Sequence, residues 1–283
     1  MNMQSVIGVD LGGTNVRTGA IREGRILKHF TESISANADA EIIIHELIDA
    51  IEHVFQPDCA GIGIGVPGVV EQTRGIIYDI ENIPSWKEVP LREIVEQRFH
   101  VPVAINNDAN CFALGEASFG KGQAYRNFVG VTLGTGIGTG IIINRQLYSG
   151  VNCGAGELGI LPYIEHDYEY YCGGQFFEHV HHVSGKAMFE AALRDDADAK
   201  KIFDEYGGHL GNALWVIVAA FAPELIVLGG SISQAFPFFQ QAIWSRLAAY
   251  PFRPSVKNLV IEPTNTPNIA LLGAAALCEA GKQ

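Results

Sequence analysis

The sequence has little positive charge. Its 283 residues include 19 Lys and Arg against 31 Asp and Glu, which gives a net charge of −12. A protein that binds a nucleic-acid backbone or an anionic membrane needs basic surface, so this composition argues against both kinds of partner. The better expectation is a small ligand that is neutral or bound to a metal ion.

Long apolar runs and a regular set of cysteines are also missing. No uninterrupted apolar run approaches the roughly 20 residues that span a bilayer. The first five residues carry neither the positive charge nor the apolar core of a signal peptide. The five cysteines are odd in number and irregularly spaced, which favours reduced thiols in a cytoplasmic protein. With 48% hydrophobic residues, the chain is long enough to form two globular domains.

A glycine-rich turn lies between two apolar strands at the start of the chain. The pattern predicts strands at 6–10 and 16–21, joined by Gly12-Gly13-Thr14. Glycines let backbone N–H groups close on a phosphate, Thr14 adds a hydroxyl, and Asp10 stands at the mouth of the turn. A plain hairpin turn is the alternative that this motif alone leaves open.

Strand and helix patterns then alternate, which predicts an α/β fold. Helices are expected at 38–55, 91–99, 109–116, 197–222 (one helix or a broken pair), 237–250 and 269–280. Further strands are expected at 26–33, 61–66, 103–105, 225–228 and 259–262.

Three polar residues follow the predicted strand at 103–105, and a helix follows them. They are Asn106, Asn107 and Asp108. The carboxyl ends of strands in α/β proteins open into a crevice where chemistry takes place. Asp108 is therefore the first candidate for a catalytic base. Its alternative role is that of a helix N-cap, which this position favours when it is considered alone.

The second half of the chain repeats the first. Residues 7–14 align with 129–136 at a constant offset, and 62–68 resemble 226–231. The glycine-alternating loop at 133–140 suits the outer phosphates of a nucleotide. Two similar α/β domains with a cleft between them are expected, at 1–110 and 111–268, with the last helix (269–283) packing back on the first. Chance repetition of glycine-rich apolar strands is the alternative.

Three other segments carry polar or titratable groups. The loop from Asn82 to Trp86 combines an amide with an aromatic ring, as sugar-binding surfaces do, although a Trp in a loop is more often a hydrophobic plug. Glu157 lies on a glycine-rich segment. The histidines at 179, 181 and 182 fit the surface of a helix better than a metal site.

Six motifs in a fixed order make the sequence similar to one family. They are Asp10-Leu11-Gly12-Gly13-Thr14-Asn15, Pro67-Gly68, Asn107-Asp108-Ala109-Asn110, Leu133-Gly134-Thr135-Gly136-Ile137-Gly138, Gly156-Glu157 and Leu228-Gly229-Gly230. The sequence resembles the ROK family of bacterial sugar kinases and repressors, within the actin-like ATPase superfamily. The resemblance covers essentially the whole chain. It implies an α/β fold of two actin-like (ribonuclease H-like) domains and a homodimer.

The resemblance also implies the role of individual residues. Asp108 would be the general base, and ATP and Mg²⁺ the cofactors, with Mg²⁺ held through water by Asp10. The sugar-binding residues would be Pro67, Gly68, Asn82, Asn107, Asp108, Glu157 and Glu178. The nucleotide would be bound by Asp10, Gly12, Gly13, Thr14, Gly134, Thr135, Gly136 and Gly138, with Gly229 and Gly230 beside the adenosine.

The sequence departs from the family at its zinc site. Most members bind a structural zinc with a histidine and a cysteine-rich loop, and that histidine also touches the sugar. Here Ile160 takes the histidine's position and only Cys172 remains of the cysteines. A structural zinc is therefore expected to be absent, with Ile160, Tyr170, Phe176 and Phe177 filling the volume by packing. The alternative is a makeshift site of Cys172 with His166, His179 or His182.

The resemblance implies ATP-dependent phosphorylation of a hexose, with glucose at its 6-hydroxyl as the leading acceptor. The alternative within the family is an N-acetylmannosamine or N-acetylglucosamine kinase. The alternative of another class is a sugar-sensing transcriptional regulator without a DNA-binding domain. Family repressors carry a helix-turn-helix ahead of the core, and a first strand that starts at Val6 is expected to leave no room for one.

Overall fold

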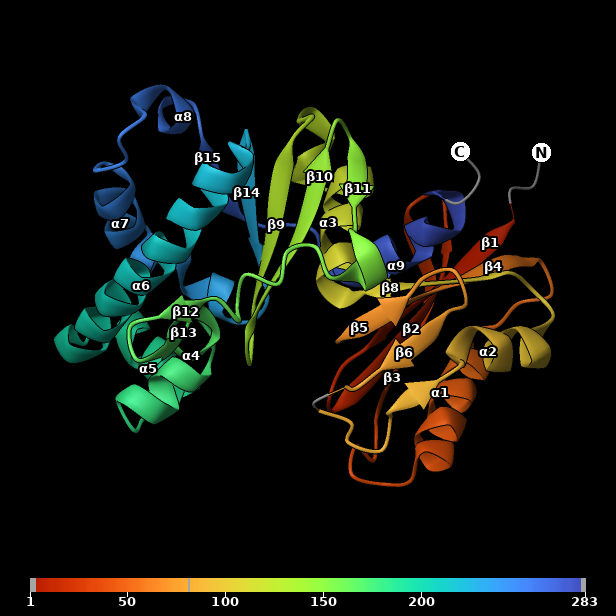
Figure 1. Ribbon diagram of the computed structural model, residues 1–283. Helices are drawn as coiled ribbons and strands as arrows, with labels where there is room; N and C mark the ends of the chain where they lie inside the picture. The colour runs from red at the N-terminus through yellow and green to blue at the C-terminus, as the bar shows by residue number, and fades with distance from the viewer. Residues whose placement is uncertain (1–3, 81, 281–283) are drawn as a thin grey trace. The chain divides into compact units, whose positions relative to one another are not determined.

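The computed structural model describes residues 4–80 and 82–280 and has the predicted α/β architecture (Figure 1). It divides into two compact units. Unit 1 comprises the chain up to Gln123, residues 146–155 and the chain from Thr266 onward, and unit 2 comprises the two segments between them. No helix within 4–80 and 82–280 combines the length and the apolar character needed to cross a bilayer.

Unit 1 is built on a sheet with the strand order β3-β2-β1-β4-β8. The three N-terminal strands pair antiparallel, and β1, β4 and β8 pair parallel. The strands of unit 1, inside and outside this sheet, are β1 (Ser5–Leu11), β2 (Asn15–Arg22), β3 (Arg25–Ser33), β4 (Cys59–Val66), β5 (Val69–Glu71), β6 (Ile76–Tyr78), β7 (Glu88–Val89), β8 (Val103–Asn107) and β11 (Gln146–Tyr148). Its helices are α1 (Ala40–Val54), α2 (Leu91–Phe99), α3 (Asp108–Phe119), the short η2 (Val151–Cys153) and α9 (Ile269–Ala280), with η1 (Lys121–Ala124) at its boundary.

The two faces of this sheet pack in different ways because side chains alternate along a strand. Ile7 and Val9 of β1 belong to a buried apolar core that includes Leu47 of α1. The glycines between them face α9 instead: a Cβ on Gly8 would lie 2.2 Å from the backbone oxygen of Leu271. The helix at the blue end of the chain therefore lies against the red and orange strands at backbone distance (Figure 1).

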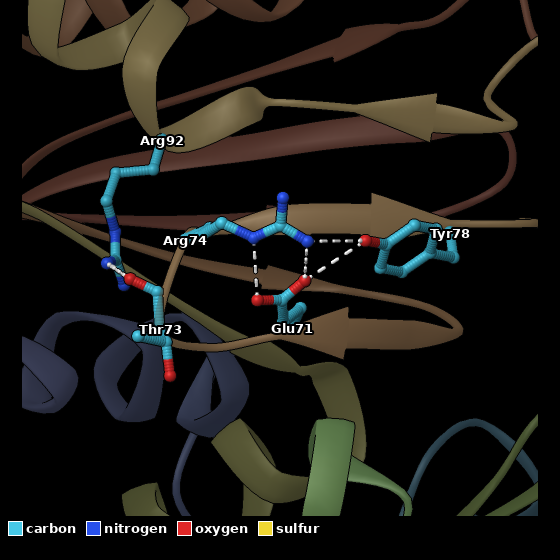
Figure 2. Close-up of polar contacts among 5 residues, drawn as sticks. All are labelled: Glu71, Thr73, Arg74, Tyr78 and Arg92. Carbon is cyan, nitrogen blue, oxygen red and sulfur yellow. Dashed lines mark hydrogen bonds and ion pairs between the residues drawn. The ribbon is translucent and has the colours of Figure 1, made fainter.

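A small sheet, β5-β6-β7, follows β4 and has no counterpart among the predicted elements. Arg74 donates from Nε to Glu71 Oε1 (2.8 Å) and from Nη2 to Glu71 Oε2, and the Tyr78 hydroxyl donates to the same Oε2 (3.0 Å) (Figure 2). From α2, Arg92 donates to the backbone oxygen of Thr73 (2.8 Å). These contacts fasten the β5–β6 turn to α2.

Unit 2 has a second sheet, in which the strands run β10-β9-β14-β15. Its strands are β9 (Phe128–Leu133), β10 (Ile137–Ile143), β12 (Pro162–Tyr163), β13 (His166–Asp167), β14 (Leu225–Gly229) and β15 (Val260–Pro263). Its helices are α4 (Tyr168–Cys172), the π-helical η3 (Phe176–Val180), α5 (Gly185–Leu193), α6 (Ala197–Phe221), η4 (Ile232–Ala235), α7 (Phe236–Leu247) and α8 (Arg253–Lys257). The long helical pattern at 197–222 is thus one helix.

The internal repeat predicted from the sequence is confirmed by the sheet topology. In unit 1 the strand order is β2-β1-β4-β8, and in unit 2 it is β10-β9-β14-β15. Each series has one antiparallel pair followed by two parallel pairs. The aligned segments 7–14 and 129–136 fall on β1 and β9, and 62–68 and 226–231 fall on β4 and β14.

The first boundary of unit 1 lies at Gln123, whereas the sequence pattern predicted a boundary after residue 110. The reason is the contact between α3 and α9, which the pattern of α3 alone does not reveal. A Cβ on Gly115 of α3 would lie 2.2 Å from the backbone oxygen of Ile269. Helix α3 is therefore part of the same packed unit as α9.

Candidate active site

The junction between β8 and α3 holds the candidate base. The side chain of Asn107 accepts hydrogen bonds from the backbone N–H groups of Ala109 (2.9 Å) and Asn110 (3.4 Å), so Asn107 is the N-cap. Asp108 is therefore not the N-cap, although its Oδ1 also accepts from the backbone N–H of Ala109 (2.7 Å). Asp108 is the first residue of the helix, so its carboxyl group lies at the positive end of the helix dipole.

Hydrogen bonds connect this junction to the predicted sugar-binding loop after β4. Asn107 Nδ2 donates to the backbone oxygen of Gly68 (3.3 Å). Gly68 has φ +86°, a left-handed conformation that strains any residue with a side chain. Asn106 Oδ1 accepts from the backbone N–H of Asn107 (2.8 Å) and from Asn110 Nδ2 (3.0 Å). Asn107, Gly68 and the preceding Pro67 thus lie together.

The turn between β1 and β2 contacts a second sugar-binding candidate. The turn is closed by a hydrogen bond from the Gly12 N–H to the Asn15 oxygen (2.9 Å). Asn82 lies so close that a Cβ on Gly13 would come within 2.8 Å of the Asn82 Cβ. The Thr14 hydroxyl accepts from Asn15 Nδ2 (3.0 Å). A predicted phosphate turn and a predicted sugar loop are therefore neighbours within unit 1, although no sequence pattern pairs them.

Asp10 and Asp108 lie on either side of Gly65. Asp10 is paired with Gly65 across β1 and β4, and a Cβ on Gly65 would lie 3.7 Å from the Asp108 Cα. Burial raises the pKa of the Cys111 thiol, and the nearby carboxylates of Asp108 and Asp10 raise it further. The absence of a side chain at Gly65 lets the start of α3 approach β4, the strand next to the one that carries Asp10.

Two opposing effects act on the pKa of the Asp10 carboxyl group. Burial raises its pKa, and the guanidinium of Arg17 lowers it. Arg17 Nη1 lies 3.3 Å from Asp10 Oδ2. Arg17 was not predicted from the sequence, although the antiparallel register of a tight hairpin places it opposite Asp10.

The glycine turn of unit 2 is held by two other glycine segments. The Gly174 N–H donates to the backbone oxygens of Gly134 (2.8 Å) and Thr135 (2.9 Å). Gly230, with φ +81°, packs so tightly that its Cβ would lie 2.2 Å from the Leu133 oxygen. The adenosine candidates Gly229 and Gly230 therefore adjoin the predicted phosphate turn, which includes Gly136 and leads into Gly138 of β10. The contribution of Gly174 was not predicted.

Glu157 lies on a segment that follows β10. The Thr139 hydroxyl donates to the backbone oxygen of Gly156. A Cβ on Gly159 would lie 2.9 Å from the Ile137 oxygen. The Glu157 side chain reaches solvent, yet neighbouring protein atoms partly desolvate its carboxyl group and raise its pKa. Glu178 belongs to η3, and its side chain is exposed.

The segment at the position of the family's zinc site packs as an aromatic core. Cys172, Phe176 and Phe177 are buried. Burial raises the pKa of the Cys172 thiol far above its usual range, which disfavours the thiolate. Tyr170 stacks on His166 with ring centroids 3.9 Å apart. Ile160 is 70% exposed, so the prediction that it fills this volume is wrong.

Among the residues that the structure describes, the histidines of this region are not grouped as metal ligands. His179 and His182 are exposed, while His181 Nε2 lies 3.3 Å from a carboxylate oxygen of Glu205. Within the described ranges, no three His, Cys, Asp or Glu side chains come together as a metal site would require. The histidines therefore lie mainly at the surface, on and after the π-helical turn.

Comparisons with known proteins show which proteins this chain is similar to. The family model described as ROK matches residues 6–280. A glucokinase from Halalkalibacterium halodurans is 31% identical over 86% of this chain and 85% of its own length. The crystal structure of a ROK family glucokinase from Streptomyces griseus, in complex with glucose and AMPPNP, has a TM-score of 0.85 and 29% identity over 96% of this chain and 98% of that one. A xylose repressor from Bacillus spizizenii is 29% identical over 87% of this chain and 69% of its own length.

Proposed function

This chain belongs to the ROK family, and from that premise we propose that it transfers the γ-phosphoryl group of ATP to the 6-hydroxyl of glucose. It is an ATP-dependent hexose kinase with the actin-like fold that the sequence predicts. The observation that carries the proposal is the match, over nearly the full chain, to a glucokinase solved with glucose and AMPPNP.

The proposed base is Asp108. A sugar hydroxyl is a weak nucleophile at neutral pH, so a carboxylate within hydrogen-bond reach must accept its proton during attack. Asp108 is supported in that role because Asn107 is the N-cap of α3 and the Asp108 carboxyl group lies at the end of β8, at the start of that helix. The proposed sugar contacts in unit 1 are Asn107, the Pro67–Gly68 turn and Asn82. Asn107 donates to the Gly68 oxygen, and Asn82 lies against Gly13.

The proposed phosphate contacts are backbone N–H groups of the two glycine turns, at 12–14 and 134–138. Charge that develops on the transferred phosphoryl group is best stabilised by preorganised donors of this kind. Asp10 fits Mg²⁺, because its carboxylate is a hard oxygen ligand next to the first turn and Mg²⁺ commonly uses one carboxylate with phosphates and water. Mg²⁺ would neutralise phosphate charge there.

The acceptor is tested with a panel of hexoses and N-acetylhexosamines in the presence of Mg²⁺ and ATP, scored by ADP release. Glucose is expected to give the highest kcat/KM. Preference for N-acetylmannosamine or N-acetylglucosamine would assign the chain to the amino-sugar kinases. Sugar binding without turnover of any acceptor would favour the regulator instead.

Sugar affinity is expected to fall as the pH drops through the raised pKa of Glu157. Above that pKa the carboxylate accepts hydrogen bonds from sugar hydroxyls, and below it the protonated group accepts them less well. Because the pKa is raised, the fall begins at a higher pH than for an ordinary glutamate. Sugar titrations between about pH 4 and pH 8 would show it.

The matched control for that titration is Glu165, an exposed glutamate of the same unit. Glu157→Gln should bind sugar more weakly at neutral pH and lose the acid fall, whereas Glu165→Gln should keep the wild-type profile. If sugar affinity still falls at low pH in Glu157→Gln, another group causes the pH dependence.

Purified protein without a histidine tag is expected to contain far less than one zinc per chain. Cys172 lies among aromatic side chains, and burial suppresses the thiolate that zinc requires. Elemental analysis measures the metal, with Cys153→Ser of unit 1 as a buried-cysteine control. Near one zinc per chain, lost with activity in Cys172→Ser but kept in Cys153→Ser, would contradict the expectation.

We further propose a cytoplasmic homodimer. The buried thiols of Cys59, Cys111, Cys153 and Cys172 fit a reducing compartment. Leu193, Trp244 and Phe252 of unit 2 are exposed large apolar side chains that a second copy would cover. Light scattering behind size-exclusion chromatography should give twice the mass of the chain, and the mass of one chain would exclude the dimer.

A further inference from the structure

An arginine stands opposite the carboxylate at the mouth of the first glycine turn. In the antiparallel register of β1 and β2, Arg17 is the direct partner of Asp10, so both side chains lie on the same face of the sheet. Arg17 Nη1 donates to Asp10 Oδ2 at 3.3 Å. The Arg17 side chain is 55% exposed and that of Asp10 is 18% exposed.

Folding stability is a weak explanation for this pair. An ion pair with one partner in solvent gains little, because water screens the charges and the long side chain loses freedom. Asp10 is also largely removed from water, which is unfavourable for a carboxylate unless it has a role. A charged group held in such a place at the mouth of a glycine turn indicates function more strongly than stability.

The surroundings show what the guanidinium can do. Residues on this face follow one another across the sheet: Arg17 on β2, Asp10 on β1 and Gly65 on β4, with Asp108 beyond Gly65. The face thus combines two carboxylates with one guanidinium beside the predicted phosphate turn. On this face the guanidinium therefore contacts the carboxylate that stands nearest to that turn.

The contact also fixes the direction of the carboxylate. In the part of the chain that the structure describes, Arg17 is the one hydrogen-bond donor to the Asp10 side chain, and it engages Oδ2. A carboxylate anchored through one oxygen holds its plane, so the other oxygen keeps one orientation. Groups that orient a metal-associated ligand in this way commonly change metal affinity or activity by about 10–100-fold when removed.

We propose that Arg17 is a positioning residue for phosphoryl transfer, which holds the Asp10 carboxylate in the orientation that receives the Mg²⁺–nucleotide. The inference rests on the proposed kinase function. Arg17 acts through Asp10 and needs no contact of its own with the phosphates. Replacing Arg17 should therefore weaken the binding of Mg²⁺–ADP while leaving sugar binding nearly unchanged.

Isothermal titration of ADP, with and without Mg²⁺, tests this independently of turnover. Arg17→Met should weaken Mg²⁺–ADP binding by about 10–100-fold and leave the binding of metal-free ADP within about twofold. Arg17→Lys should recover part of the loss, because a lysine retains the charge without the planar fork. In steady-state assays kcat should fall in parallel, with the sugar KM within about twofold of wild type.

Arg22 provides the matched control. It lies at the other end of β2 and pairs with Asp58 at 2.5 Å. Arg22→Met removes the same kind of ion pair from the same strand, so it should change the melting temperature only slightly and leave Mg²⁺–ADP affinity unchanged. If Arg17→Met behaves like Arg22→Met, the pair is structural and the proposal is overturned.

A double-mutant cycle decides whether Arg17 works through Asp10. In an Asp10→Asn background, Arg17→Met should add almost no further loss of Mg²⁺–ADP affinity, because the group it positions is gone. Additive losses would mean that Arg17 acts on the nucleotide directly, which overturns the positioning role. Absence of turnover with every hexose in the wild type would refute the kinase function, while the ADP titrations would still decide the role of Arg17.

Discussion

Asp108→Asn should lower kcat by about 10²–10⁴, because it removes the carboxylate that accepts the proton of the attacking hydroxyl. That loss corresponds to about 3–5 kcal/mol of transition-state stabilisation. The fold should be kept, since Asn107 supplies the N-cap of α3 and an asparagine at 108 retains an oxygen that can accept from the Ala109 N–H (2.7 Å). Steady-state kinetics would show a fall in kcat with a small change in sugar KM.

The comparison variant is Asp198→Asn, the same change in the first turn of α6. It alters the charge at a helix N-terminus in the same way, so it controls for the helix dipole. Melting curves and ADP titrations should match wild type for both variants, and kcat should fall only in Asp108→Asn. Unchanged turnover in a folded Asp108→Asn protein would remove Asp108 from the mechanism.

The parts of the fold that the sequence predicted are those with strong local periodicity. Residues 91–99 and 269–280 form helices with the predicted bounds, and the β1–β2 hairpin has its predicted turn. The small sheet from Val69 to Val89 was missed, because its strands are two or three residues long. Strands of that length show no alternation that separates them from a turn.

The residues of the candidate site also divide into those that a local sequence pattern reveals and those that depend on tertiary partners. Asp108, Asn107 and the glycine turns stand out because polar residues or glycines interrupt apolar strands. Arg17 and Gly174 did not stand out, since their importance depends on partners that only the folded chain brings near. Ile160 was misjudged for a related reason: an apolar residue was assigned to packing, and its segment leaves it in solvent. Sequence patterns report a residue's own preference and not its tertiary neighbours.

Gly273→Ala should destabilise the protein by about 3–5 kcal/mol, near the upper end for single substitutions. Gly273 lies in α9, where an added Cβ would be 1.7 Å from the Cys111 oxygen and 2.6 Å from the Gly115 nitrogen, both backbone atoms of α3. Backbone cannot turn aside as a flexible side chain can, so the two helices must separate. Because α3 begins at Asp108, the folded fraction should also lose activity. Calorimetry and kinetics at low temperature would measure both effects.

Gly208→Ala is the matched control, because Gly208 also lies inside a helix and, apart from the neighbouring backbone of that helix, no atom lies within 4 Å of its added Cβ. There the substitution only restricts the unfolded chain and improves helix propensity, so it should stabilise by about 0.5–1 kcal/mol. The same chemical change thus has opposite signs at two helical glycines, and the difference is the α3–α9 contact. A Gly273→Ala protein that melts as wild type does and keeps its turnover would mean that α3 and α9 tolerate separation. The close approach of these helices would then not be what positions Asp108.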